Sequence, residues 1–227
     1  MFLTKENNIL WRRMFFAAVV VAIVVLAGVF WFDAPLLLWM RKFDIAPWNW
    51  FDRLFDAKLW LIVSGVIVCM FYLKKALISK PKFRNERNKF SLRVFINDCL
   101  EKTKTSYAFF IFCAVSGACV VTEIFKVVIG RMRPVFYEAL DITGFYPFRM
   151  GWEFHSMPSG HAAASFAGLV MLGLLVPRIK WATWTLATLV GISRVCYGAH
   201  WPSDVVFGAF IGMVAADFAR AVISRRN

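Results

Sequence analysis

Histidine and acidic residues are scarce in this chain, which limits the chemistry that it can carry. Its 227 residues include three histidines and 14 Asp or Glu, against 27 Lys or Arg. The five cysteines are odd in number, none has metal-ligand spacing, and Cys69, Cys113 and Cys119 fall in long apolar runs. We therefore interpret the cysteines as packing residues and predict neither a disulfide nor a metal site.

The basic excess gives a formal net charge of +13, a value that can indicate a nucleic-acid-binding protein. However, the sequence contains no recognisable element for reading bases, no internal repeat and no low-complexity tract. It also lacks a clear small-x-small cleavage site after its first apolar run, which argues against a signal peptide. Arg12 and Arg13 resemble a twin-arginine signal but are better explained as basic anchors of a first span. We expect no nucleic-acid partner.

Long apolar runs, by contrast, are abundant, and hydrophobic residues make up 60% of the chain. Such runs of about 17–25 residues can cross a membrane as helices. Six runs lack the polar face of a soluble helix: Met14–Phe32, Leu59–Leu73, Ser106–Ile129, Ala162–Val176, Trp181–Ser193 and Val205–Val222. The second and fifth are short and need polar residues at their ends. The sequence therefore predicts an all-α polytopic protein with six transmembrane helices, forming one membrane domain over residues 1–227.

The distribution of basic residues predicts the orientation of these spans. With a cytoplasmic N-terminus, 18 of the Lys and Arg residues fall on the cytoplasmic side and nine on the other. Ten of the 18 lie between Lys74 and Lys104. Because basic residues favour cytoplasmic loops, we expect both termini in the cytoplasm. The basic loop is then placed to meet anionic lipid headgroups.

The segments between the runs carry expectations of their own. Asp33–Lys58 is rich in tryptophan, which favours the membrane interface. Within it, Leu36–Met40 predicts a short interfacial helix. Phe90–Leu100 predicts an amphipathic helix on the inner surface, and Gly130–Met157 predicts an outer loop broken by glycine and proline.

Three polar stretches in the second half of the chain hold two of its three histidines. They are Lys126-x6-Arg133-Pro134, Pro158-Ser159-Gly160-His161 and Ser193-Arg194-x5-His200-x3-Asp204. The predicted topology places all three on the outer face. We therefore expect them to form one site there.

The middle stretch is suited to binding an anion. Pro158 fits the first turn of a helix, where its missing N–H is not needed. Ser159 and Gly160 can then offer free backbone N–H groups, and the helix dipole adds to the attraction. The alternative is a simple helix cap.

The cations of the other two stretches are suited to phosphate. Arginine offers a planar fork to phosphate oxygens and lysine a point charge, so Lys126, Arg133 and Arg194 are candidate phosphate ligands. The alternatives are snorkelling to the interface and, for Lys126, an ion pair with Glu123. Arg131 shares the loop but breaks the spacing, and we leave it out of the site.

The histidines are suited to phosphoryl transfer. His200 and Asp204 are four residues apart, so a helical turn can place the carboxylate beside the ring. Asp204 would then orient the imidazole, which makes His200 a candidate nucleophile that forms a phosphohistidine. His161 would be the general acid that protonates the leaving oxygen. The alternative is two interfacial histidines bonded to loops; His155 fits that description, and we assign it no role.

Written out, the stretches read Lys126-Val-Val-Ile-Gly-Arg-Met-Arg133-Pro134, Pro158-Ser-Gly-His161 and Ser193-Arg194-Val-Cys-Tyr-Gly-Ala-His200-Trp-Pro-Ser-Asp204. Together they resemble the signature of the type 2 phosphatidic acid phosphatase (PAP2) superfamily, with every position filled across residues 126–204. The resemblance implies an α-helical core and a phosphatase that needs neither metal nor cofactor. It implies His200 as nucleophile, Asp204 as its partner and His161 as acid. It implies phosphate binding by Lys126, Arg133, Ser159, Gly160 and Arg194.

The resemblance and the six spans indicate a bacterial inner-membrane enzyme acting on a phosphorylated membrane lipid. Bacterial inner-membrane members of the superfamily act on phosphatidylglycerol phosphate, phosphatidic acid, undecaprenyl pyrophosphate or lipid A. One alternative is a lipid phosphotransferase, in which a second lipid rather than water accepts the phosphoryl group. Another is a non-enzymatic transporter or lipid-binding protein, which would leave the two histidines and Asp204 unexplained. Vanadium-dependent haloperoxidases share the signature but are soluble, which the apolar runs disfavour.

Overall fold

The structure is a computed structural model that describes residues 1–4, 7–45, 47–78 and 107–224. Within these ranges all regular elements are helices, apart from two isolated β-bridges. The α-helices are α1 (Trp11–Ala27), α2 (Asp33–Met40), α3 (Pro47–Leu54), α4 (Ala57–Ile78), α6 (Tyr107–Ile129), α7 (Pro134–Leu140), α8 (Gly160–Leu175), α9 (Lys180–Cys196) and α10 (Pro202–Ser224). The all-α expectation is confirmed, whereas the helix expected at Phe90–Leu100 lies outside the residues described.

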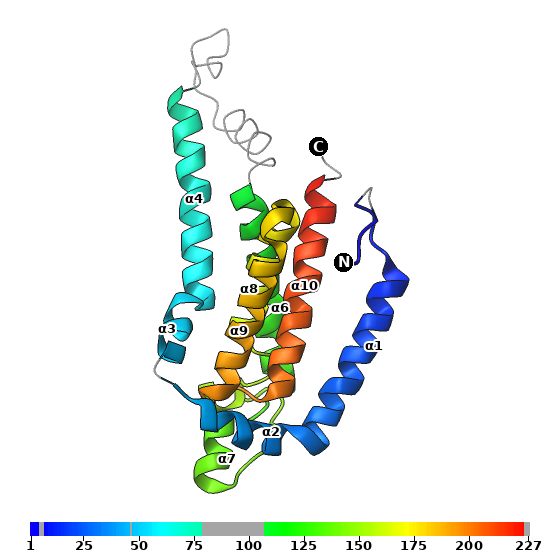
Figure 1. Ribbon diagram of the computed structural model, residues 1–227, viewed down its shortest axis with the longest axis vertical. Coiled ribbons are helices and arrows are strands. Elements are labelled where there is room, and N and C mark those ends of the chain that lie inside the picture. The colour runs from blue at the N-terminus through cyan, green and yellow to red at the C-terminus, as the bar shows by residue number, and fades with distance from the viewer. Residues whose placement is uncertain (5–6, 46, 79–106, 225–227) are drawn as a thin grey trace.

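Helix α8 is at the centre of the bundle, packed against α6, α9 and α10 (Figure 1). Its buried face is made of small residues, among them Ala163, Ala164 and Ala167. Two glycines of α10 let it approach closely: a Cβ at Gly208 would overlap the carbonyl oxygen of Ser159, and one at Gly212 that of Ala163. Small residues at a helix interface allow this backbone contact. The contact fixes the start of α10 against the start of α8.

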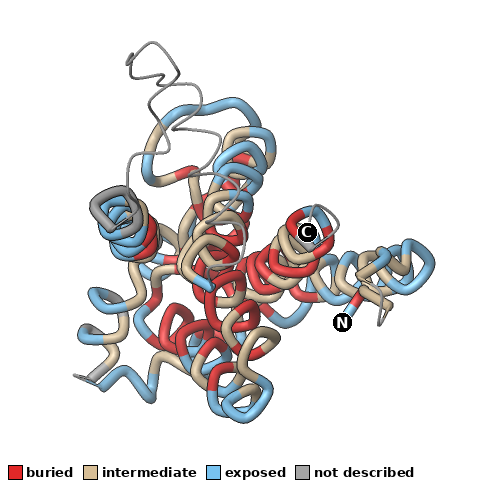
Figure 2. Tube along the Cα trace, turned by 90° about the horizontal axis from the view of Figure 1, so that it is seen from above, coloured by how far each residue is buried: buried red, intermediate tan, exposed pale blue. Residues whose placement is uncertain are grey.

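Helices α1 and α4 stand at the periphery of the bundle (Figure 1). Viewed along the bundle, buried residues concentrate in the central helices (Figure 2). Large apolar side chains such as Phe15, Phe16 and Ile23 on α1 are exposed. A helix that exposes its apolar side chains is suited to a lipid environment.

Among the described residues, three helical segments are long and apolar enough to cross a membrane: Trp11–Phe43, Tyr107–Ile129 and Pro202–Ile223. Helix α8 is apolar but has 16 residues. Over the described residues each of the six apolar runs coincides with helix, apart from Val176, which is the C-cap of α8, while their number as membrane spans stays a prediction. Pro202 begins α10, ahead of the last apolar run.

The segments between the long helices differ in part from expectation. Residues 36–40, where an interfacial helix was expected, are helical and form the end of α2, which follows α1 through a π-helix at Gly28–Phe32. The loop expected at Gly130–Met157 contains α7 and a 3₁₀ turn at Trp152–Phe154. Pro158 was expected inside the first turn of its helix, but Ser159 is the N-cap and Pro158 precedes it. The Ser159 side chain, rather than Pro158, therefore caps the first turn of α8.

Candidate active site

The three polar stretches meet at one end of the bundle, where α6 and α9 end and α8 and α10 begin (Figure 1). Two hydrogen bonds tie them together. The Ser159 N–H donates to the carbonyl oxygen of Asp204 at 3.0 Å, and Arg133 Nη1 donates to the carbonyl oxygen of Ala199 at 3.1 Å. The convergence expected from the topology is therefore present in the fold.

His200 lies in the turn between α9 and α10, and 2% of its surface is exposed. Its Nδ1 is 2.8 Å from the carbonyl oxygen of Ser156, so Nδ1 carries the hydrogen and Nε2 has the free lone pair. Burial lowers the pKa of His200 to about 3; Asp204 opposes this shift, while Arg133 and Arg194 add to it. The ring is therefore a neutral base at physiological pH.

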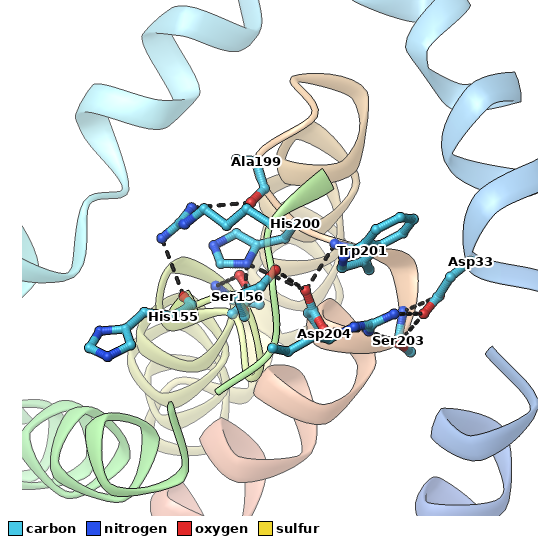
Figure 3. Close-up of polar contacts among 12 residues, drawn as sticks. Asp33, His155, Ser156, Ala199, His200, Trp201, Ser203 and Asp204 are labelled. Atoms are coloured by element: carbon cyan, nitrogen blue, oxygen red, sulfur yellow. Dashed lines mark hydrogen bonds and ion pairs between the residues drawn. The ribbon is translucent and has the colours of Figure 1, made fainter. Parts of the chain in front are cut away.

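Asp204, in the first turn of α10, is completely buried and binds several donors (Figure 3). Its Oδ2 accepts from Ser156 Oγ at 2.6 Å and from the Trp201 N–H at 3.0 Å. The same oxygen is 3.8 Å from His200 Nδ1, which is longer than a hydrogen bond. Asp204 thus acts on the ring by its charge, and it orients the ring through Ser156.

Arg131 was left out of the predicted site because it breaks the spacing, yet the structure places it against Asp204. Its Nη1 donates to Asp204 Oδ1 at 2.7 Å, and its Nη2 donates to Asp33 Oδ2 at 2.7 Å. The ring of Trp201 lies 5.0 Å from its guanidinium carbon. Motif spacing could not indicate this contact, because it joins positions 73 residues apart in the sequence.

Arg133, the N-cap of α7, joins the loops that surround His200. Its Nε donates to the Trp152 carbonyl at 3.0 Å, Nη1 to that of Ala199 at 3.1 Å and Nη2 to that of His155 at 3.3 Å. Burial, with the nearby charge of Arg194, lowers the pKa of Arg133 to about 10, so it stays charged at neutral pH. A guanidinium has five N–H donors, and two of them are not used by these bonds.

The start of α8 offers fewer backbone donors than expected. Ser159 Oγ caps the helix by accepting from the Ala162 N–H, but the Ser159 N–H is taken by Asp204. Of the two N–H groups expected to be free, only that of Gly160 lacks a partner within the part of the chain described. A Cβ at Gly160 would lie 3.3 Å from Lys126 Nζ, so this cation sits over the helix start.

Three remaining site residues have partners as well. Lys126 Nζ is 2.6 Å from Glu123 Oε1, the ion pair weighed as an alternative. His161 Nε2 is 3.5 Å from Asp56 Oδ2, which precedes α4. The Arg194 carbonyl accepts from the N–H groups of Ala199 and His200 at 3.1 and 3.3 Å, which closes the turn after α9. His155 contributes its carbonyl to Arg133, consistent with a role in the loop.

A comparison with protein-family profiles decides the family: the PAP2 superfamily profile matches residues 106–227. The chain belongs to the PAP2 superfamily. It is an integral membrane protein, and the PAP2 match contains all three polar stretches and their contacts with α8 and α10.

The segments that match this chain cover less than half of the length of the first curated relatives. A "Lipid A 1-phosphatase" of Rhizobium johnstonii is 34% identical over 111 residues, which cover 47% of this chain and 46% of the relative. An "Undecaprenyl-diphosphatase" of Sulfolobus acidocaldarius is 36% identical over 96 residues, covering 42% and 45%. The crystal structure of Aquifex aeolicus LpxE aligns with 87% of this chain and 97% of its own, at a TM-score of 0.49 and 18% identity. At that score the structural likeness supports no further conclusion.

Three residues of this PAP2 site were missed by sequence reasoning. Ser156 binds His200 through its backbone carbonyl, which any residue would provide, and its hydroxyl binds Asp204, 48 residues along the chain, so nothing in the local sequence marked it. Arg131 and Asp33 did carry one: each is a charge next to an apolar run, and such charges are often functional. Their pairing joins positions 98 residues apart, and only the fold shows it.

Proposed function

We propose that this protein is a membrane lipid phosphatase that removes a phosphate monoester, or the terminal phosphate of a pyrophosphate, through a phosphohistidine on His200. The observation that carries the proposal is the state of the His200 ring. Its Nδ1 hydrogen is committed to Ser156 and its pKa is about 3, so Nε2 has a lone pair for attack at neutral pH. The relatives named as lipid A 1-phosphatase and undecaprenyl-diphosphatase support a lipid phosphate as substrate.

In the first step the Nε2 lone pair forms a bond to phosphorus as the bond between phosphorus and the lipid oxygen breaks. The electron pair of that bond goes to the lipid oxygen, which takes a proton from His161. Since Nδ1 keeps its hydrogen, the phosphorylated ring is a cation. In the second step His161 takes a proton from water, the oxygen attacks phosphorus, and the bond to Nε2 breaks to release inorganic phosphate.

The phosphate would be held by charges that surround this ring. Arg133 has two N–H groups left, the Gly160 N–H has no described partner, and Lys126 Nζ lies beside Gly160. Arg194 adds its charge from α9. Cations and oriented N–H groups stabilise the charge that develops in phosphoryl transfer. Lys126 is paired with Glu123, but an ammonium has three N–H donors and can bind the phosphate as well.

The same proposal includes the membrane arrangement. Six spans with cytoplasmic termini would place the site at the outer face of a bacterial inner membrane. The basic-residue distribution supports this orientation. The last turns of α10 lie at the end of the bundle opposite α7 (Figure 1), which agrees with a cytoplasmic C-terminus if the site faces outward.

The test is phosphate release by the purified protein in detergent micelles. The panel consists of phosphatidylglycerol phosphate, phosphatidic acid, undecaprenyl pyrophosphate and lipid A, with His200→Ala as control. We expect at least one lipid to release phosphate with the wild type and none with the variant. Transfer of labelled phosphate to a second lipid would indicate a phosphotransferase instead, and no turnover of either kind would contradict the proposal.

A further inference from the structure

Asp33, Arg131 and Asp204 form a row of buried charges that ends beside His200. Their side chains are 3%, 4% and 0% exposed. Arg131 lies between the two carboxylates, with Nη2 2.7 Å from Asp33 and Nη1 2.7 Å from Asp204. Figure 3 shows the row running from Asp33 past Ser203 to Asp204. Asp204 then faces His200 at 3.8 Å.

Asp33 is held firmly at the far end of this row. Its Oδ1 accepts from the Ser203 N–H at 2.9 Å, and its Oδ2 accepts from the Ser203 hydroxyl. The π-helix at Gly28–Phe32 delivers Asp33 to this position, and π-helical turns are frequent at functional sites. Gly28 is needed there, since a Cβ would come within 2.8 Å of Ser203 Cβ. Asp33 lies outside the segment that matches the family profile, residues 106–227.

The charges of this row have a consequence for phosphoryl transfer. Asp204 alone would stabilise the cation that forms on His200, but Arg131 neutralises it at 2.7 Å. A buried cation is costly unless a counter-charge balances it. Asp33 brings the row to a net charge of −1, so one negative charge remains to balance the phosphorylated ring.

We propose that Asp33, acting through Arg131, is a positioning residue of the phosphoryl-transfer step that supplies the buried negative charge opposite the cationic phosphohistidine. This inference rests on the proposed phosphohistidine chemistry. Asp33 touches neither the phosphate nor His200. Its effect therefore belongs to the chemical step and not to lipid binding.

The experiment compares Asp33→Asn, Arg131→Gln and the double variant, using a lipid that the wild type hydrolyses. Asp33→Asn keeps the shape but sets the net charge of the row to zero, and Arg131→Gln sets it to −2. The double variant restores −1. We expect Asp33→Asn to lower kcat on the order of tenfold, equivalent to about 1.4 kcal/mol, with KM within about twofold. The double variant should be more active than either single variant.

Asp217→Asn is the matched control for loss of a buried carboxylate. Asp217 is 4% exposed and accepts from the Phe2 N–H at 2.6 Å, about 20 Å along α10 from Asp204. It should lose thermal stability but keep kcat. A structural role for Asp33 would give the same pattern for Asp33→Asn, namely lower stability and unchanged kcat, and would overturn the proposal.

Two further results decide the case if a single variant does not fold. A folded double variant with kcat within about tenfold of wild type supports the charge balance, and a larger loss of kcat overturns it. If both single variants fold, the proposal is also overturned when the fold-loss of kcat in the double variant equals the product of the losses in the two single variants. Wild-type turnover is established first, so failure of the proposed function is seen before any of these comparisons.

Discussion

The carbonyl oxygen of Ser156 lies 2.8 Å from His200 Nδ1, whereas the nearest oxygen of Asp204 is 3.8 Å away. The ring is therefore oriented by a backbone carbonyl, and the Asp204 carboxylate acts on it through Ser156 and by its charge. Ser156 belongs to both contacts, because its hydroxyl also donates to Asp204 at 2.6 Å. A shift of this loop would disturb the ring and its counter-charge together.

This geometry predicts the protonation state of His200. Because its pKa is about 3, the ring should stay neutral with hydrogen on Nδ1 between pH 8 and 5. Imidazole ¹⁵N chemical shifts of histidine-labelled protein check this, since the chain has three histidines that single His→Asn variants assign. An unfolded histidine titrates near 6.5, so unfolding takes up a proton as pH falls from about 6.5 toward 3, and stability decreases in that window. A ring that is protonated at pH 6 would contradict the burial described.

Removal of the nucleophile should abolish turnover without unfolding the protein. Loss of a nucleophile in a hydrolase costs on the order of 10⁶-fold in kcat, so His200→Ala should show no activity above background. Asp204→Asn should lower both activity and stability, because Asp204 also binds Arg131, Ser156 and Trp201. Phosphate release and elution from a size-exclusion column separate the two effects. Near-normal turnover by folded His200→Ala would contradict the assignment.

The sequence predicted the helices and the site well where the signal was local. Apolar runs predicted the positions of the helices, and a motif of three stretches predicted where they meet, since both depend on neighbouring residues. It predicted poorly where one residue acts on another far along the chain. The wrong reading of Arg131 shows why: its pairing with Asp33 depends on how α1 and α2 turn back to the bundle. The loss of the Ser159 N–H to Asp204 likewise depends on the packing of α10 on α8.

That packing predicts different outcomes for two glycine variants. A Cβ at Gly208 would overlap the Ser159 carbonyl oxygen, whereas one at Gly117 on α6 would meet nothing within 4 Å. Gly208→Ala should therefore lower the thermal stability and displace the start of α8, with loss of activity. Gly117→Ala should be neutral or stabilising by up to about 1 kcal/mol, because alanine favours a helix. Thermal unfolding of both variants in one detergent checks this, and equal stability would argue against the close contact.

The orientation in the membrane is tested by cysteine labelling in a cysteine-free background. Arg178 and Thr143 are both exposed, and they lie in the loops predicted to face the cytoplasm and the outside. A membrane-impermeant thiol reagent added to intact cells should label Thr143→Cys and leave Arg178→Cys unlabelled until the membrane is opened. The prediction rests on the basic-residue distribution. The reverse pattern would place the site, and its lipid, in the inner leaflet.

Hydrolysis should not depend on a divalent metal. Fixed cations and N–H groups can neutralise a transferring phosphoryl group without Mg²⁺, and a two-metal site needs several ligands around ions about 3.5–4 Å apart. Across the described ranges no group of three or more His, Cys, Asp or Glu side chains is placed to hold a metal ion. Activity should therefore survive excess EDTA, and vanadate should inhibit because it adopts the trigonal shape of the transition state. Arg194→Ala should weaken vanadate inhibition along with turnover, whereas Arg178→Ala, on an exposed turn, should change neither. If EDTA abolished activity and Mg²⁺ restored it, the phosphohistidine mechanism would have to be abandoned.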